Sequence, residues 1–159
     1  MKKVFLTLLA ALCLFNAEAQ LKTPAPSPTQ TVKQDFGLGS IELSYSRPVM
    51  KGRKIFGDLV PFGNVWRTGA NSATLVTFSD EVTIGGKKVP AGKYGLLSIP
   101  NKDSWTLIIS KQLDVTSPAA YKQESDVVRV VVNSMKMETK LESFTMQFAN
   151  LKPTSCELH

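Results

Sequence analysis

Short strand-like segments rich in apolar residues, separated by turn residues, recur along this chain and restrict what it can fold into. From Ser40 the order Ile-Glu-Leu-Ser-Tyr places an apolar side chain at every second position, as a strand with one buried face requires. Further segments bounded by Gly, Pro, Asn or Asp cover residues 73–79, 81–84, 87–89, 94–99, 105–110, 126–134 and 143–148. The pattern predicts an all-β fold, an antiparallel β-sandwich or partly open barrel of about eight strands.

Local signals refine this prediction. Gly85-Gly86 predicts a two-residue hairpin, because both glycines can adopt the positive φ of a primed turn. The nearly continuous apolar run 127–132 predicts a central strand covered on both faces. Alternation of apolar and polar residues over 143–148 predicts a strand with one solvent-exposed face. Residues 156–159 resemble the start of a further strand. Only residues 119–125 could form a helix, of about two turns.

The first residues have the layout of a secretory signal. Lys2 and Lys3 precede an apolar run over residues 4–15, and Ala17-Glu18-Ala19 offers small residues at a cleavage site. We therefore expect a signal peptide over residues 1–19 and an exported, periplasmic or secreted protein. The apolar run is shorter than the roughly 20 residues a membrane-spanning helix needs, so no integral membrane segment is expected in the mature chain.

Residues 20–34 contain Pro24, Pro26 and Pro28 and few apolar side chains, which predicts a disordered Pro-rich tether. A single β domain is expected over residues 35–159. Beyond residue 19 only Cys156 remains, so an intramolecular disulfide is excluded there. With one His, at the C-terminal position, no zinc or copper cluster, catalytic residue or cofactor is predicted.

Charge argues against some partners. Loss of Lys2, Lys3 and Glu18 would leave 17 basic and 12 acidic residues, a formal charge of +5. This moderate excess includes no dense Lys/Arg tract, so nucleic-acid binding is not expected. The expected partners are a small anion, a glycan or an envelope protein.

The 47–71 loop is the candidate site. It lacks helical or strand periodicity, yet the stretch 46–71 contains five cationic side chains, four glycines and one Trp. Arg presents a planar set of donors suited to carboxylate, sulfate or phosphate, and Trp offers a flat face to a sugar ring. Long loops with this composition are often functional. The predicted ligand-binding residues are Arg47, Lys51, Arg53, Trp66, Arg67 and Asn71.

Three other interpretations remain open. The loop residues could brace an irregular segment, because Arg and Asn donors commonly satisfy backbone carbonyls. A carboxylate-based envelope hydrolase is a second alternative, with Asp58, Asp80, Glu81 and Asp103 as candidates, although carboxylates also serve as ordinary turn residues. The third is a purely structural or interaction protein.

A resemblance to a known family is carried by five runs: Ser46-Arg47-Pro48, Lys51-Gly52-Arg53-Lys54-Ile55-Phe56-Gly57, Leu59-Val60-Pro61-Phe62-Gly63, Val65-Trp66-Arg67-Thr68-Gly69-Ala70-Asn71 and, further on, Pro90-Ala91-Gly92-Lys93-Tyr94. These runs resemble the exported bacterial family of domain of unknown function 2911. The resemblance extends from about Asp35 to the C-terminus. It implies a secreted or periplasmic protein of a Gram-negative bacterium and no established activity. It also implies a further strand containing a Trp, so that this sequence would be truncated within a strand.

Overall fold

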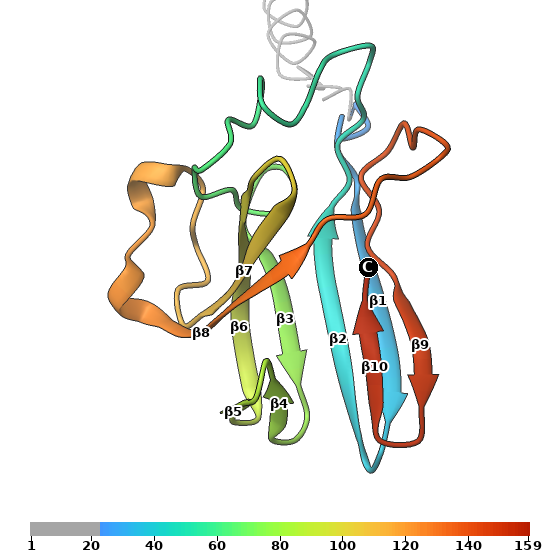
Figure 1. Cartoon of the computed structure of the whole chain (residues 1–159), viewed down its shortest axis with the longest axis vertical. Coiled ribbons are helices and arrows are strands. Elements are labelled where there is room, and N and C mark those ends of the chain that lie inside the picture. Colours follow the sequence, from blue (N-terminus) through green and yellow to red (C-terminus); the bar gives the residue numbers. More distant parts are fainter. Residues whose placement is uncertain (1–22) are drawn as a thin grey trace, which may run out of the picture.

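The computed structural model describes residues 23–159. Its main body is a six-stranded antiparallel sheet with the strand order β1-β2-β3-β6-β7-β8 (Figure 1). The strands are β1 (Thr29–Phe36), β2 (Gly39–Ser46), β3 (Thr74–Phe78), β6 (Gly92–Pro100), β7 (Ser104–Ser110) and β8 (Asp126–Asn133). The predicted signal peptide over residues 1–19 lies outside the described residues.

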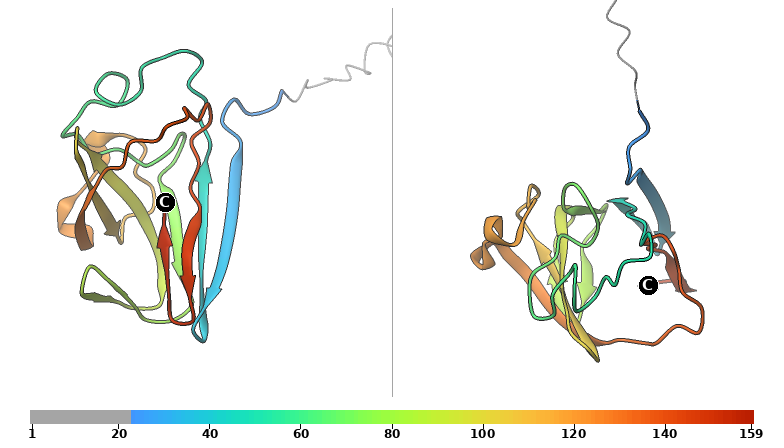
Figure 2. Two further views of the ribbon diagram at one scale, coloured as in Figure 1. Left: turned by 45° about the vertical axis from the view of Figure 1, so that its right-hand side comes forward. Right: turned by 90° about the horizontal axis from the view of Figure 1, so that it is seen from above.

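Two hairpins complete the β structure. β4 (Val82–Ile84) pairs with β5 (Lys87–Val89) through Gly85-Gly86, as predicted, and β9 (Phe148–Lys152) pairs with β10 (Ser155–Leu158). The sheet curves, and the β9–β10 hairpin lies against it beside β1 and β2 (Figure 2). The all-β antiparallel prediction is confirmed, and the described strands form no closed barrel. The predicted short helix consists of two 3-10 turns, Pro118–Ala120 and Gln123–Ser125.

Side chains of the central strands enter two apolar clusters because successive residues of a strand point to opposite faces. Leu96 and Ile109 belong to the larger cluster, which the two hairpins help to cover. Leu97 and Ile108 belong to the smaller one, which includes Val115 from the segment between β7 and β8. The core therefore occupies both faces of the middle of the sheet.

Strand β1 corrects the predicted boundary at residue 34. It begins at Thr29 and pairs along its whole length with β2, from Thr29 opposite Ser46 to Phe36 opposite Gly39. Only Val32 and Phe36 supply apolar contact with the larger cluster. An edge strand needs little apolar content because backbone hydrogen bonds to its neighbour hold it in register, which is why composition suggested a tether here.

Strand β8 is an edge strand, so its predicted central position is wrong. It pairs only with β7 among the described strands. Val128 is buried, whereas Val131 is 69% exposed. Valine favours extended structure both in edge strands and in central strands. A run of valines therefore does not indicate how many neighbouring strands β8 has.

The predicted strand over 143–148 is also wrong in position. The chain there makes one isolated bridge, Val49 with Ser143, and β9 begins only at Phe148. Met146 is nevertheless buried in the larger apolar cluster, and its N–H donates to the Tyr45 hydroxyl at 2.9 Å. In residues 23–159 no helix is long and apolar enough to cross a membrane.

Candidate ligand-binding site

The 47–71 loop closes one end of the sheet (Figure 1). Three isolated bridges fix its course: Val49 with Ser143, Phe56 with Val60, and Trp66 with Ser98. Lys51 and Gly52 adopt positive φ angles of 49° and 71°, so the chain reverses sharply there. The first and third bridges anchor the two ends of the loop to other segments, and the second is a contact within the loop.

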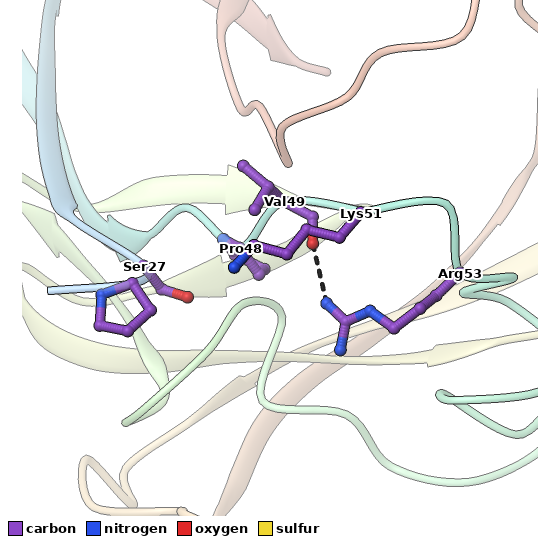
Figure 3. Close-up of a pocket in the computed structure, with 6 residues that line it drawn as sticks. Ser27, Pro48, Val49, Lys51 and Arg53 are labelled. Carbon is purple, nitrogen blue, oxygen red and sulfur yellow. Dashed lines mark hydrogen bonds between the residues drawn. The ribbon is translucent and has the colours of Figure 1, made fainter.

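A hollow of about 390 Å³ lies where the loop leaves β2. Its lining combines two cationic side chains with apolar and backbone surface: Pro26, Ser27, Pro48, Val49, Lys51 and Arg53. Figure 3 shows the Lys51 side chain extending back past Val49 towards Pro48, with the Arg53 guanidinium to one side. Two of the six predicted site residues, Lys51 and Arg53, thus meet at one cavity.

Arg53 is held in place by the loop itself. Its Nε donates to the Met50 carbonyl at 2.9 Å and one terminal nitrogen donates to the Val49 carbonyl at 2.8 Å. The other terminal nitrogen has no hydrogen bond within the described residues, and nor has the Lys51 ammonium. Both cations are solvent-exposed, so each retains donors for an incoming group.

The other predicted residues lie outside the lining of the hollow. Half-buried Arg47 donates to the Phe144 carbonyl at 3.0 Å and to the Thr145 hydroxyl at 2.9 Å. It thereby ties the start of the loop to the segment that precedes β9. Asn71 donates to the Ser46 hydroxyl at 3.2 Å and, over a longer 3.4 Å, to the Ser27 carbonyl.

Arg67 joins the loop to another segment. One terminal nitrogen donates to the Thr116 carbonyl at 2.7 Å, while its buried Nε has no partner within the described residues. The arginines at 47, 53 and 67 therefore do not converge on one cavity. Each donates to backbone carbonyls, as the brace interpretation expects.

Trp66 belongs to an aromatic cluster. Its ring makes edge-to-face contacts with Phe56, Trp105 and Phe144 at centroid distances of 5.6, 6.1 and 5.1 Å. Its indole N–H donates to the Gly69 carbonyl at 3.1 Å. With three aromatic neighbours it does not offer an open face to a sugar. No sequence pattern pointed to Trp105 or Phe144 as its neighbours, because they lie far away along the chain.

Thr68 forms a buried hydroxyl pair that the sequence interpretation missed. It adopts a φ of 56°, unusual for a β-branched residue. Its hydroxyl lies 2.9 Å from that of Ser98, and its carbonyl accepts a 2.6 Å hydrogen bond from Thr74. These contacts satisfy polar groups under the loop. The only signal in the sequence was the run Arg-Thr-Gly-Ala-Asn itself.

Asp126 is the one carboxylate of the described residues that is not exposed, and its side chain is 8% accessible. Tyr121 donates a hydrogen bond to its Oδ2, Arg129 lies 3.7 Å away, and Oδ1 is buried without a partner. Burial raises the pKa of Asp126 above its usual value, against the opposing effects of Tyr121 and Arg129. Burial, together with the Asp126 contact, raises the pKa of Tyr121 to about 12. This pair fastens the segment between β7 and β8 to the sheet.

The carboxylates proposed for a hydrolase are dispersed. Asp58, Asp80, Glu81 and Asp103 are all exposed and lie outside strands. Within residues 23–159 no group of three or more His, Cys, Asp or Glu side chains could hold a metal ion. His159 lies 3.0 Å from Glu157, and its hydrogen bond, with one from Asn150, lowers the pKa of that carboxyl.

The fold and the hollow define an all-β domain with a small, partly cationic surface cavity. The chain matches the family model described as "Protein of unknown function (DUF2911)" over residues 27–159. It therefore belongs to the DUF2911 family, and the match includes β1. No curated protein and no solved structure matches the chain.

Proposed function

We propose that this protein is an exported binding module whose 47–71 loop takes a small molecule bearing a carboxylate or phosphate group. The observation that carries the proposal is the hollow of about 390 Å³ to which Lys51 and Arg53 both contribute. Arg53 is pre-oriented by two backbone carbonyls. A side chain that is already ordered loses less conformational entropy on binding.

The apolar part of the lining limits the ligand class. Pro26, Pro48 and Val49 contribute a surface without charge, which suits the carbon skeleton of a small acid. A Lys ammonium supplies a mobile point charge and Arg a planar donor set, so one oxyanion can meet both. An acidic sugar would meet these requirements through its carboxylate, without stacking on Trp66.

Two variants and one control test the proposal. Inorganic phosphate and glucuronate are titrated into the protein while the backbone amide resonances of residues 49–53 are followed by NMR. Lys51→Ala should weaken binding about tenfold, because one charge-assisted contact is lost. Arg53→Lys should weaken it by a comparable factor, because Lys cannot retain the two-carbonyl anchoring. Lys54→Ala removes an exposed charge next to the hollow and should leave binding nearly unchanged.

Equal weakening by Lys54→Ala would show nonspecific attraction of anions and contradict the proposal. No titration with either probe in the wild-type protein would also contradict it. The brace interpretation of Arg47, Arg67 and Asn71 holds whichever result is obtained, because those residues do not line the hollow.

A further inference from the structure

We infer that the end of the molecule bearing the 47–71 loop docks onto an anionic lipid bilayer. The inference rests on exposed apolar side chains that do not line the hollow, and on basic side chains of which Lys51 and Arg53 also line it. It requires no ligand in the hollow. It concerns two loops that lie side by side at this end: the 47–71 loop and residues 134–143, which follow β8 (Figure 1).

Hydrogen bonds hold the two loops together. The Met50 N–H donates to the Glu142 carbonyl at 2.8 Å, and the Lys51 N–H donates to the Glu142 carboxylate at 2.7 Å. Val49 bridges Ser143, and the Phe144 N–H donates to the Pro48 carbonyl at 2.9 Å. The loops are therefore joined to each other where residues 48–51 meet residues 142–144.

Large apolar side chains project from both loops. Leu59 is 56% exposed and Met137 is 61% exposed. The full set of exposed apolar residues in these loops is Phe56, Leu59, Phe62, Met135, Met137 and Leu141. Apolar side chains gathered at one end of a domain mark an interaction surface.

The charges among these residues select the partner. Residues 51–62 and 135–142 contain five basic and three acidic side chains, a formal excess of two positive charges. The basic ones are Lys51, Arg53, Lys54, Lys136 and Lys140. An anionic headgroup layer attracts Lys and Arg side chains that lie near its surface. The acyl boundary below accepts apolar side chains. A bilayer satisfies both sets of side chains at once.

The opposite end of the sheet supplies a matched control. The turn between β1 and β2 bears Leu38, and β9 ends nearby, as the 2.6 Å hydrogen bond from Gly37 N–H to the Pro153 carbonyl shows. Leu151 on β9 is 55% exposed and Leu38 fully exposed. These leucines match the loop residues in size and exposure, but no bilayer contact is expected for them.

The experiment measures sedimentation of the protein with vesicles of phosphatidylcholine containing phosphatidylglycerol, and with vesicles of phosphatidylcholine alone. The chain begins at Gln20 in every sample, because every described strand lies beyond that residue. Leu59→Ser with Met137→Ser should lower the partition coefficient about tenfold or more. Leu38→Ser with Leu151→Ser should leave it unchanged. Binding should weaken with added salt.

Several results would overturn the inference: no binding of the wild-type chain to the anionic vesicles, equal loss in both double variants, or equal binding to neutral vesicles. Analytical ultracentrifugation of the same proteins tests for a second copy as the occupant. A dimer lost only in Leu59→Ser with Met137→Ser would assign the surface to self-association and overturn the bilayer. Lys54→Glu with Lys140→Glu, outside any core contact, should reduce vesicle binding as well.

Discussion

At the scale of single residues, the guanidinium groups of the 47–71 loop mainly satisfy main-chain carbonyls: Arg53 those of the loop itself, Arg47 and Arg67 those of other segments. Arg47, Arg53 and Arg67 each donate to at least one main-chain carbonyl. An irregular segment leaves carbonyls without strand partners, and a multi-donor side chain satisfies them. A loop can therefore be rich in arginine for structural reasons alone. A role in ligand binding requires side-chain donors that are not already bonded to backbone carbonyls.

Arg47 provides the first prediction. Arg47→Ala removes hydrogen bonds to the Phe144 carbonyl and the Thr145 hydroxyl in a half-buried place. The free energy of unfolding should fall by about 1–3 kcal/mol, because an acceptor is left unsatisfied. Denaturant titration measures this change. Lys54→Ala, an exposed control, should stay within about 0.5 kcal/mol of wild type, and equal losses in both would argue against the brace.

Tyr121 provides a prediction for alkaline pH. Its pKa of about 12 in the folded protein lies above the ordinary value of 10.0. Between these values the unfolded state releases the phenol proton first, so stability from this group is present below pH 10 and falls as pH rises towards 12. The free energy of unfolding of Tyr121→Phe should decline less steeply in that window than that of wild type. Parallel declines would contradict the Tyr121–Asp126 pair as the source.

At the scale of elements, the β4–β5 hairpin depends on its two glycines to different degrees. Both have positive φ, 56° at Gly85 and 79° at Gly86. A Cβ at Gly85 would lie 2.5 Å from the Val130 side chain on β8, whereas one at Gly86 would have nothing within 4 Å. The hairpin therefore packs on the edge strand through Gly85.

Replacing each glycine by Ala separates these two effects. Gly86→Ala should cost about 1 kcal/mol of unfolding free energy, the price of positive φ in an L residue. Gly85→Ala should cost more, because a clash with a short branched side chain adds to the same strain. Thermal unfolding of both variants measures the difference. Equal destabilisation would mean that the hairpin does not press against Val130.

At the scale of the whole molecule, the aromatic cluster joins the loop end to the core. Edge-to-face contacts run from buried Tyr45 through Phe144 and Trp66 to Phe56 and Trp105. These residues come from β2, the segment before β9, the 47–71 loop and β7. The loop is thus packed into the same cooperative unit as the sheet.

Unfolding should therefore follow a single transition. Trp66 and Trp105, the two tryptophans of the chain, report on the loop end by fluorescence, and far-UV circular dichroism reports on the strands. The two denaturant curves should superimpose, as two-state unfolding requires. A fluorescence transition at lower denaturant would show that the loop end opens separately.

How far the sequence could predict this structure depends on the range of the interaction involved. Period-two alternation identified β2, strand-like segments bounded by turn residues identified β3, β6 and β7, and Gly85-Gly86 identified the hairpin, because these signals act between neighbours along the chain. The edge position of β8 and the extent of β1 were missed. Both depend on which strands lie beside them. The hollow lies at the loop in which the candidate site was predicted, but only Lys51 and Arg53 of the six predicted residues line it.

By itself the sequence determined the all-strand fold, the positions of most turns and the concentration of cations in the 47–71 loop. Only the tertiary structure decided which of these cationic side chains remain available to bind a ligand. Arg47 and Arg67 donate to the carbonyls of residues 144 and 116, and no local sequence pattern predicts these partners. A backbone carbonyl is present at every residue, so folding alone selects which of them a given guanidinium satisfies.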